Sequence, residues 1–290
     1  MIARNLTEKY GYAVRPVCEL LDLSTSSYYY HGQQLAERQL KTDLEAVAGQ
    51  YPTYGSRRLT HQLRREPYAH RVNRKRIQRL MRKMGLLRPV KRRKVRTTDS
   101  QHPYLRYPNL VKELEITHPE QVWVSDITYI RLHNDFVYLA IILDVFTRAI
   151  RGWCLSRTID QQLTLDALRA ALQAHPAPQI HHSDQGLQYA AHAYVKLLKA
   201  HHVQISMATI GKAEENGYAE RFMRTIKEEE VDLSEYRDFT EAHRQIGVFI
   251  QDVYMTKRIH SALGYLTPAE FENAWWRSQI LPEQISTPFD

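Results

Sequence analysis

Three acidic residues, far apart in the sequence, have the types and settings that metal-dependent chemistry on phosphodiesters requires. Asp126 lies within a run of apolar residues, Asp184 stands at the end of a short predicted strand, and Glu220 lies near the start of a helical pattern. A carboxylate among apolar residues is costly unless a partner compensates it, and a divalent cation is a common partner. Since cysteine or histidine pairs at metal spacing are absent, this oxygen-only set selects Mg²⁺ or Mn²⁺ over zinc.

Two such cations about 4 Å apart solve the problem of phosphodiester displacement without a covalent protein nucleophile. One lowers the pKa of an attacking water or 3′-hydroxyl, and the other stabilises the leaving 3′-oxygen. The same site can hydrolyse a strand and then join its 3′-end to a new target. We therefore predict that Asp126, Asp184 and Glu220 are the catalytic residues and the ligands of two Mg²⁺ or Mn²⁺ ions.

The segments around these acids predict one mixed β-sheet covered by helices. Segments rich in β-branched and aromatic residues predict strands over residues 122–130, 136–146, 149–157, 179–184 and 203–207. Helices are predicted over residues 163–174 and 191–201, and from the end of the polar stretch 209–217 to about residue 230. Three strands joined by tight turns, followed by strand–helix alternation, combine an antiparallel part with crossover units. We expect an α/β fold whose mixed five-stranded sheet, flanked by helices, could bring the three acids together.

The first 90 residues predict helices instead. Apolar residues recur at helical spacing over residues 14–21, and Ser24 can cap a short helix over residues 25–30. Further helical stripes comprise Leu44 with Val47, Leu59 with Leu63, and Ile77, Leu80, Met81 and Met84 after a cap at Asn73, with Gly85 at the end. This pattern indicates a helix-turn-helix type of region.

The last of these helices has a basic face that suits a DNA groove. Opposite its apolar stripe it carries Lys75, Arg79 and Arg82, together with Gln78. The alternative is a solvated helix with long basic side chains. The run 91–96, which includes Arg92 and Arg93, is too charged to pack and is expected to be a linker that binds phosphates nonspecifically.

Charge and composition point the same way. Residues 1–100 hold 22 Lys and Arg against 8 Asp and Glu, whereas the remaining residues hold 18 against 24. A basic half beside an acidic one suggests a polyanion-binding module joined to another domain. The longest apolar run, residues 136–143, is too short to cross a membrane, and the two cysteines are isolated. We expect a cytoplasmic protein with no membrane partner.

Four further polar positions near the acids have less specific interpretations. Asp144 could come near the site, but a turn-capping acid is the preferred reading. His182 could orient the neighbouring acid or touch the scissile phosphate, or be a satisfied strand-end histidine. Asn216 is expected to position the end of the last helix, and Glu215 to lie in a flexible loop that makes it a poor metal anchor.

The spacing of the acids resembles that of DDE transposases and retroviral integrases, because 35 residues separate Asp184 from Glu220. More narrowly, the chain resembles the second-frame (OrfB) proteins of the IS-three family of insertion sequences. The matching motifs are HSDQG at 182–186, NGYAERF at 216–222, Lys227, Trp123 and Thr128 around Asp126, and the D-x-F-T-R of residues 144–148. The likeness extends from about residue 44 to 271. Met255 and Ile259 depart from the family pattern, so Arg258 and His260 are expected to be structural.

This resemblance implies an RNase H-like catalytic fold, magnesium dependence, and cleavage and 3′-end transfer of element ends into target DNA. It also implies a homo-oligomer on DNA and a first-frame (OrfA) helix-turn-helix partner. Arg224 and Lys227 share a helical face with Glu220 and could hold terminal DNA phosphates, with ion pairing to Glu220 or Glu228 as the alternative. Two rival functions remain, a catalytically silent DNA-binding regulator and an RNase H-type nuclease without strand transfer.

The expected organisation has four parts. A helical DNA-binding region covers residues 1–96, and a linker covers residues 97–118. An RNase H-like catalytic core covers residues 119–235, and a C-terminal helical extension over residues 236–290 completes the catalytic domain.

Overall fold

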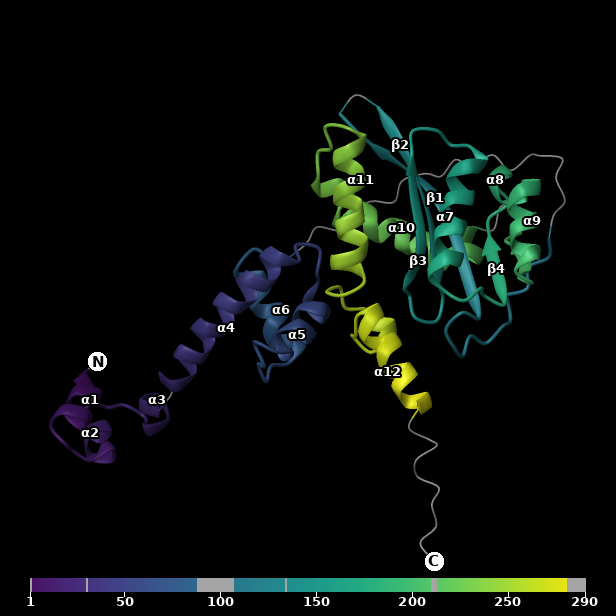
Figure 1. Ribbon diagram of the computed structural model, residues 1–290. Coiled ribbons are helices and arrows are strands. Elements are labelled where there is room, and N and C mark those ends of the chain that lie inside the picture. Colours follow the sequence, from purple (N-terminus) through teal and green to yellow (C-terminus); the bar gives the residue numbers. More distant parts are fainter. Residues whose placement is uncertain (1, 30, 88–106, 134, 210–212, 281–290) are drawn as a thin grey trace, which may run out of the picture. The chain divides into compact units, whose positions relative to one another are not determined.

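The computed structural model describes residues 2–29, 31–87, 107–133, 135–209 and 213–280. They belong to two compact units, residues 1–90 and residues 91–290. Figure 1 shows the elements of each unit. Within the described ranges, no helix has both the length and the apolar character needed to span a membrane.

The described part of the first unit is helical, as predicted. Its elements are α1 (Ile2–Arg4), a π-helix (Asn5–Lys9), α2 (Val14–Leu20), α3 (Thr25–Tyr29), α4 (His31–Gln50), α5 (Ser56–Arg64) and α6 (Arg74–Lys83). The Ser24 hydroxyl accepts a hydrogen bond from the backbone N–H of Ser27 at 3.1 Å, which confirms the predicted cap of α3.

Helices α4, α5 and α6 bury the stripes that the sequence indicates. The buried side chains are Leu44, Val47, Leu59, Leu63, Ile77, Leu80 and Met81. Asn73 caps α6, since its side-chain oxygen accepts from the Arg76 N–H at 2.8 Å. Gly85 follows the helix with φ +69°, the left-handed conformation that glycine adopts at helix ends.

The second unit is built on one five-stranded sheet. Its strands are β1 (Val122–Arg131), β2 (Phe136–Asp144), β3 (Ile150–Ser156), β4 (Ile180–Ser183) and β5 (Gln204–Met207), in the spatial order β3-β2-β1-β4-β5. β1, β2 and β3 are antiparallel neighbours, whereas β4 is parallel to β1 and β5 is parallel to β4. The predicted mixed sheet is therefore confirmed.

Helices cover both faces of this sheet (Figure 1). They are α7 (Gln161–Ala174), α8 (Leu187–Ala190), α9 (His192–Ala200), α10 (Gly217–Glu229), α11 (Phe239–Val248) with a π-helical continuation (Phe249–Tyr254), and α12 (Pro268–Ile280). Short 3₁₀ turns cover Ala213–Asn216, Val231–Leu233 and Ser261–Leu263. One apolar cluster joins the sheet to α10 and α11, and a second joins the opposite face to α7, α8 and α9. The sequence predicts no helix at α8, and it gives no separate bounds for α12 within the helical extension predicted over residues 236–290.

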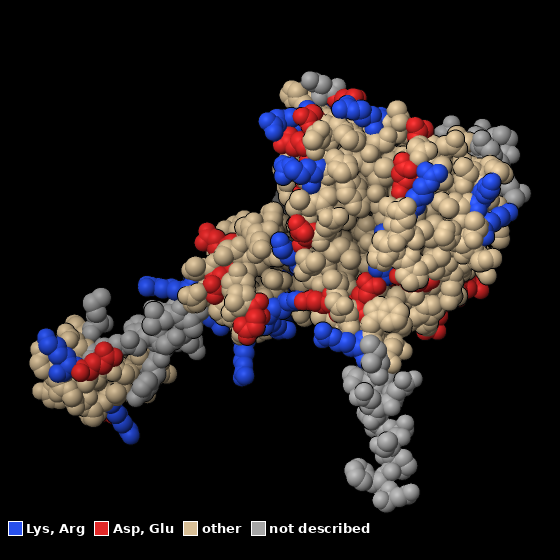
Figure 2. All heavy atoms as spheres, viewed as in Figure 1, with Lys and Arg blue, Asp and Glu red and all other residues tan. Residues whose placement is uncertain are grey.

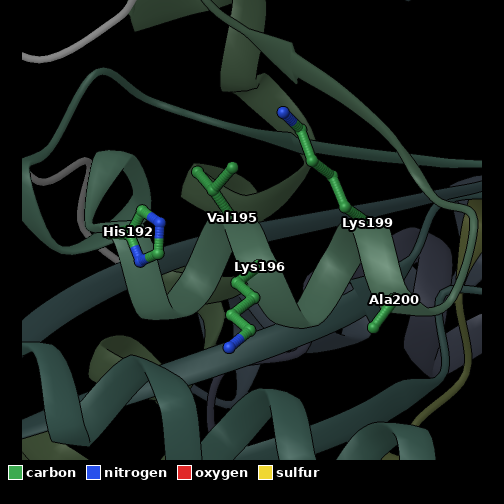
Figure 3. Close-up of a pocket in the computed structure, with 5 residues that line it drawn as sticks. All are labelled: His192, Val195, Lys196, Lys199 and Ala200. Atoms are coloured by element: carbon green, nitrogen blue, oxygen red, sulfur yellow. The ribbon is translucent and has the colours of Figure 1, made fainter.

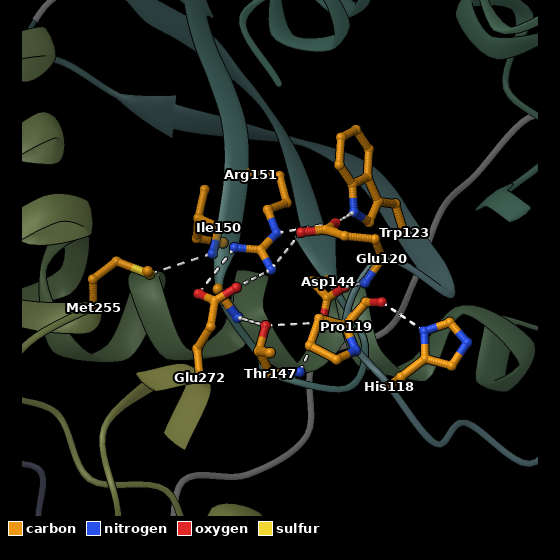
Figure 4. Close-up of polar contacts among 11 residues, drawn as sticks. His118, Pro119, Glu120, Trp123, Asp144, Thr147, Ile150, Arg151, Met255 and Glu272 are labelled. Atoms are coloured by element: carbon orange, nitrogen blue, oxygen red, sulfur yellow. Dashed lines mark hydrogen bonds and ion pairs between the residues drawn. The ribbon is translucent and has the colours of Figure 1, made fainter. Parts of the chain in front are cut away.

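A buried ion cluster fastens α12 to the sheet (Figure 4). Arg151 of β3 lies 2.8 Å from Glu120, which precedes β1, and 2.5 Å from Glu272 of α12. Trp123 also donates its indole N–H to Glu120. Burial raises the pKa of Glu120 to about 7, although the Arg151 charge opposes that shift. The cluster joins segments that are about 120 residues apart in the sequence.

Candidate active site

Asp126 and Asp184 lie on neighbouring parallel strands at the same level. In the β1–β4 register Val124 is opposite His182, and each aspartate lies two residues further along its chain. Since side chains alternate along a strand, both aspartates are expected on the side of Val124, whose cluster includes α10. Both aspartates are partly buried. Parallel strands lie about 4.8 Å apart, so the sheet brings these two predicted site residues together.

The segment after β4 holds the Asp184 carboxylate against its own backbone. Asp184 Oδ1 accepts from the Gly186 N–H at 3.0 Å. A Cβ added to Gly186 would lie 3.0 Å from the same oxygen, so a side chain here would press on the carboxylate. Glycine is needed here because the Asp184 carboxylate approaches the Gly186 backbone closely, and not because the backbone has a positive φ.

Helix α10 carries Glu220 in its first turn and is tied to β1 beside Asp126. Asn216, which precedes the helix, donates from Nδ2 to the Ser125 carbonyl at 3.0 Å. Ser125 is adjacent to Asp126, so this bond fixes the start of the helix at the level of the aspartates. The buried face of α10 comprises Ala219, Phe222, Met223, Thr225 and Ile226. Asn216 thus positions the helix end, as predicted.

Tyr189 of α8 is a neighbour of both aspartates, and nothing in the sequence pattern marked it as a site residue. Its side chain is buried, and burial together with the negative charges of Asp184 and Asp126 raises its pKa well above the usual value. The phenol is therefore neutral at physiological pH. An aromatic five residues after Asp184 was the available signal, but it does not differ from an ordinary core residue.

The three carboxylates offer the oxygen donors that Mg²⁺ or Mn²⁺ prefers, so the residue types fit these ions. In the described ranges, no group of three or more His, Cys, Asp or Glu side chains is arranged so that it could hold one metal ion. Asp126 Oδ1 instead accepts from the Ile127 N–H at 2.9 Å. The β1–β4 pairing thus brings Asp126 and Asp184 together, and each carboxylate accepts from a nearby backbone N–H.

The two histidines of β4 are structural. His182 is fully buried, and its Nδ1 lies 2.8 Å from Ser206 Oγ of β5 rather than against Asp184. Burial lowers the pKa of His182 to about 4 and that of His181 to about 3. Both rings are consequently neutral near pH 7, and neither carries charge to a phosphate.

Two other acids are held by structural bonds. Asp144 is buried at the end of β2, where its Oδ1 accepts from the N–H and hydroxyl of Thr147 at 2.7 and 2.8 Å. The predicted turn-capping role is confirmed. Glu215 lies in the 3₁₀ turn Ala213–Asn216 rather than in a loop, which corrects the prediction, and it accepts from Asn109 Nδ2 at 2.8 Å and from the Thr209 N–H at 2.7 Å.

The predicted DNA-contact residues fall into three groups. Lys75, Arg79 and Arg82 are exposed on α6, opposite its buried stripe. Arg92 and Arg93 lie outside the described residues.

On α10, Arg224 is exposed and the ammonium of Lys227 lies 4.4 Å from the ring centroid of Tyr129. Near the end of that helix Arg258 is buried and pairs with Glu229 at 2.7 Å, which confirms its structural role.

Other surface features do not coincide with the acids. A hollow along α9 is lined by His192, Val195, Lys196, Lys199 and Ala200 (Figure 3). None of the three predicted catalytic residues lines it. On the face of the second unit drawn in Figure 2, basic and acidic side chains are interspersed.

Comparison with known proteins agrees with this architecture. The integrase core domain family matches residues 116–213 and, through a second family of the same description, residues 201–268. An HTH-like domain family matches residues 34–94.

Two bacterial relatives match nearly the whole chain. A transposase for insertion sequence element IS629 from Shigella sonnei is 34% identical, with 94% of this chain and 95% of the relative covered. A transposase for insertion sequence element IS904 from Lactococcus lactis subsp. lactis (strain IL1403) is 34% identical, with 83% and 96% covered. Among solved structures, the HTLV-2 integrase catalytic core domain in complex with magnesium is 15% identical, with a TM-score of 0.42, 53% of this chain and 97% of that chain covered.

The class defined by the fold and these matches is that of transposases with an integrase-type core on an RNase H-like α/β fold, preceded by a helix-turn-helix-like region. Within this class the chain belongs to the IS-three family of insertion-sequence transposases.

Proposed function

We propose that this transposase cleaves DNA at the ends of an insertion sequence and transfers the resulting 3′-ends into target DNA. Asp126, Asp184 and Glu220 are the proposed catalytic residues and the ligands of two Mg²⁺ or Mn²⁺ ions. The observation that carries the proposal is the level placement of the two aspartates on β1 and β4. The Asn216 bond to Ser125, which holds the start of the Glu220 helix beside them, supports it.

Each residue has a separate part in this proposal. Asp126, Asp184 and Glu220 would hold the ions, which would supply Lewis-acid chemistry for the attacking hydroxyl and the leaving oxygen. Asp126 and Asp184 are set by the rigid sheet, and Glu220 by a helix whose apolar face is buried. Asp126 Oδ1 and Asp184 Oδ1 each accept a backbone N–H, from Ile127 and Gly186, and these bonds orient the two carboxylates.

The first test replaces each acid by its amide. We expect Asp126→Asn, Asp184→Asn and Glu220→Gln each to abolish metal-dependent nicking of DNA carrying the element ends while leaving DNA binding within about twofold. Nicking and binding would be measured on the same oligonucleotides, because an amide retains the shape of the side chain but is a poor ligand for a hard cation. Asp166→Asn, an exposed acid of α7, is the matched control and should cut like wild type. Residual cutting by any of the three amide variants would remove that residue from the proposed site.

A second assay separates the rival functions. A nuclease without strand transfer would cut the ends but would not join a pre-cleaved 3′-hydroxyl end to another duplex. A silent regulator would bind the ends and do neither, even after addition of a first-frame (OrfA) protein. We propose that the active species on DNA is a homo-oligomer and that such an OrfA protein is a partner.

A further inference from the structure

Arg148 and Tyr218 form a stacked pair at the start of α10, the helix that carries Glu220. Arg148 lies in the turn between β2 and β3, and Tyr218 is in the first turn of α10, two residues before Glu220. The guanidinium carbon lies 4.1 Å from the ring centroid, a cation–π contact that fixes the ring. Tyr218 nevertheless remains 46% exposed.

The backbone holds Arg148 in this position. Its φ is +61°, in the left-handed region that is uncommon for residues other than glycine. The Arg148 N–H donates to the Asp144 carbonyl at 2.9 Å, and the Tyr254 hydroxyl donates to the Arg148 carbonyl at 3.0 Å. The Arg148 side chain is therefore directed at Tyr218 by a built turn rather than by chance on a mobile surface.

One nitrogen of the Arg148 guanidinium has no acceptor. Its Nη1 is buried and has no hydrogen-bond partner. Buried N–H groups of charged side chains are ordinarily satisfied, because leaving one unpaired is unfavourable. Arg258, which lies near the same Tyr254, is by contrast paired with Glu229 through 2.7 and 2.8 Å bonds. A guanidinium with an unpaired nitrogen suits an anion that arrives with a ligand.

Two further arginines continue this surface along α10. Arg221 and Arg224 are exposed, and in the part of the chain that the structure describes neither has a carboxylate within ion-pairing distance. At about 100° per residue, the outward side chains follow one another around the helix in the order Tyr218, Arg221, Arg224, Glu220. A nucleic-acid strand leaving the proposed metal site along this arc would meet cations first and then the aromatic ring.

We propose that Tyr218 and Arg148 form a subsite for an unpaired nucleotide of the DNA strand that leaves the proposed metal site around α10. The base stacks on the face of Tyr218 that Arg148 does not cover, and the phosphate is held by Arg148 with Arg221. Aromatic rings bind bases without regard to sequence, because every base has a π-face. The proposal deepens the proposed function and rests on it for the position of the metal site.

The test is a binding measurement that needs no cleavage. The full chain would be titrated, without a divalent metal, into a blunt DNA duplex and into the same duplex carrying a short unpaired 5′ strand with a fluorescent adenine analogue. Wild type should bind the unpaired probe about tenfold more tightly, since stacking on an aromatic is worth about 1–3 kcal/mol per base. Binding should also quench the fluorescence of the analogue.

Matched variants assign the effect to the pair. Tyr218→Leu should lose both the preference and the quenching, whereas Tyr218→Phe should keep them because it retains the ring. Arg148→Met should weaken binding of the unpaired probe. Phe136→Leu is the control, because Phe136 is an aromatic of β2 with almost the same exposure, 45%.

The outcomes distinguish this subsite from the proposed function. Quenching that depends on Tyr218 in a protein that never cuts DNA would support the subsite and contradict the transposition chemistry. Normal cutting together with a Tyr218→Leu variant that binds and quenches like wild type would overturn the subsite alone. A wild-type protein that does not prefer the unpaired probe also overturns it. If Tyr218→Leu unfolds, as judged by circular dichroism, Arg148→Met decides in its place.

Discussion

At the scale of single residues, the candidate site depends on Gly186, because a side chain at this position would crowd the Asp184 carboxylate. The Asp184 oxygen that accepts from the Gly186 N–H lies 3.0 Å from where a Cβ at position 186 would stand. Tyr189 is buried, and the negative charges of both aspartates help to raise the pKa of its phenol. The orientation of the Asp184 carboxylate depends on its bond to the Gly186 N–H.

We predict that Gly186→Ala lowers metal affinity more than it lowers stability. The added methyl group would crowd Asp184 Oδ1, and disturbing a group that orients a ligand typically costs about 10- to 100-fold in metal affinity. Mn²⁺ binding would be followed by titration and unfolding by heating. Gly49→Ala in α4 is the control, because nothing lies within 4 Å of the Cβ added there. Equal Mn²⁺ affinity in Gly186→Ala and wild type would show that Asp184 is not a ligand.

At the scale of elements, the sheet and helix α7 pack through a contact that only glycine permits. A Cβ on Gly152 of β3 would lie 2.3 Å from the Ala167 carbonyl oxygen and 2.9 Å from the Ala171 nitrogen, both in the backbone of α7. Neither atom can move without shifting the helix. This close approach sets the distance between α7 and the antiparallel half of the sheet.

Gly152→Ala should accordingly destabilise the second unit. Overpacking costs about 1–3 kcal/mol where side chains can adjust, and here backbone must move, so we expect a loss at the upper end of that range or beyond. Urea unfolding followed by tryptophan fluorescence would measure the loss. Gly217→Ala is the matched control, since an added Cβ meets nothing within 4 Å there. Equal unfolding midpoints for both variants would contradict the packing argument.

Prediction from sequence succeeded for elements whose pattern is local. The strands of the sheet and the capped helix α6 follow from β-branched runs, helical stripes and Asn73. Helix α8 has only four residues, too few to show a period, and α12 alternates apolar and polar residues without a clear stripe. The loop predicted at Glu215 was wrong because its bonds to Asn109 and Thr209 come from distant segments.

The candidate site was predictable only in part for the same reason. Residue types and the interval between Asp184 and Glu220 single out the acids. That Asp126 stands level with Asp184 depends on the β1–β4 register, which pairs residues 58 positions apart and leaves no local trace. The stacking of Arg148 on Tyr218 is likewise a contact between distant segments, and neither residue type alone marks it.

At the scale of the whole molecule, the two parts of the chain differ in the sign of their net charge. The first 100 residues carry a large excess of Lys and Arg, whereas the rest of the chain carries an excess of acids. In the proposed function a polyanion binds at an acidic metal site, so it is an advantage that the sequence-independent attraction comes from elsewhere in the chain. Affinity for DNA is then expected to depend on the basic region and chemistry on the acidic one.

We predict that replacing Lys75, Arg79 and Arg82 with Ala flattens the salt dependence of DNA binding. Each phosphate contact contributes about 0.9 to the slope of log affinity against log salt, so loss of three contacts should reduce it by about 2 to 3. Fluorescence anisotropy at several salt concentrations would measure the slope.

A second triple variant controls for the lost charge. Lys9, Arg15 and Lys41 lie outside α6, and their replacement with Ala removes the same net charge from the first unit. In that variant the slope of log affinity against log salt should be nearly the same as in wild type. If both triple variants lose it equally, the effect is one of overall charge and α6 does not lie against DNA.

The ion cluster around Arg151 indicates where a shortened protein that contains the catalytic domain should end. The integrase core match stops at residue 268, yet Glu272 supplies one of the two carboxylates around a guanidinium that is 1% exposed. Shortening the protein to the end of the match would leave Glu120 as the single counter-ion of a buried cation and would uncover Phe146, whose ring stacks near Phe271 and Trp275 of α12. An expression fragment that ends beyond α12 keeps both, so the natural stopping point of the folded core lies after residue 280 rather than at the boundary that similarity alone suggests.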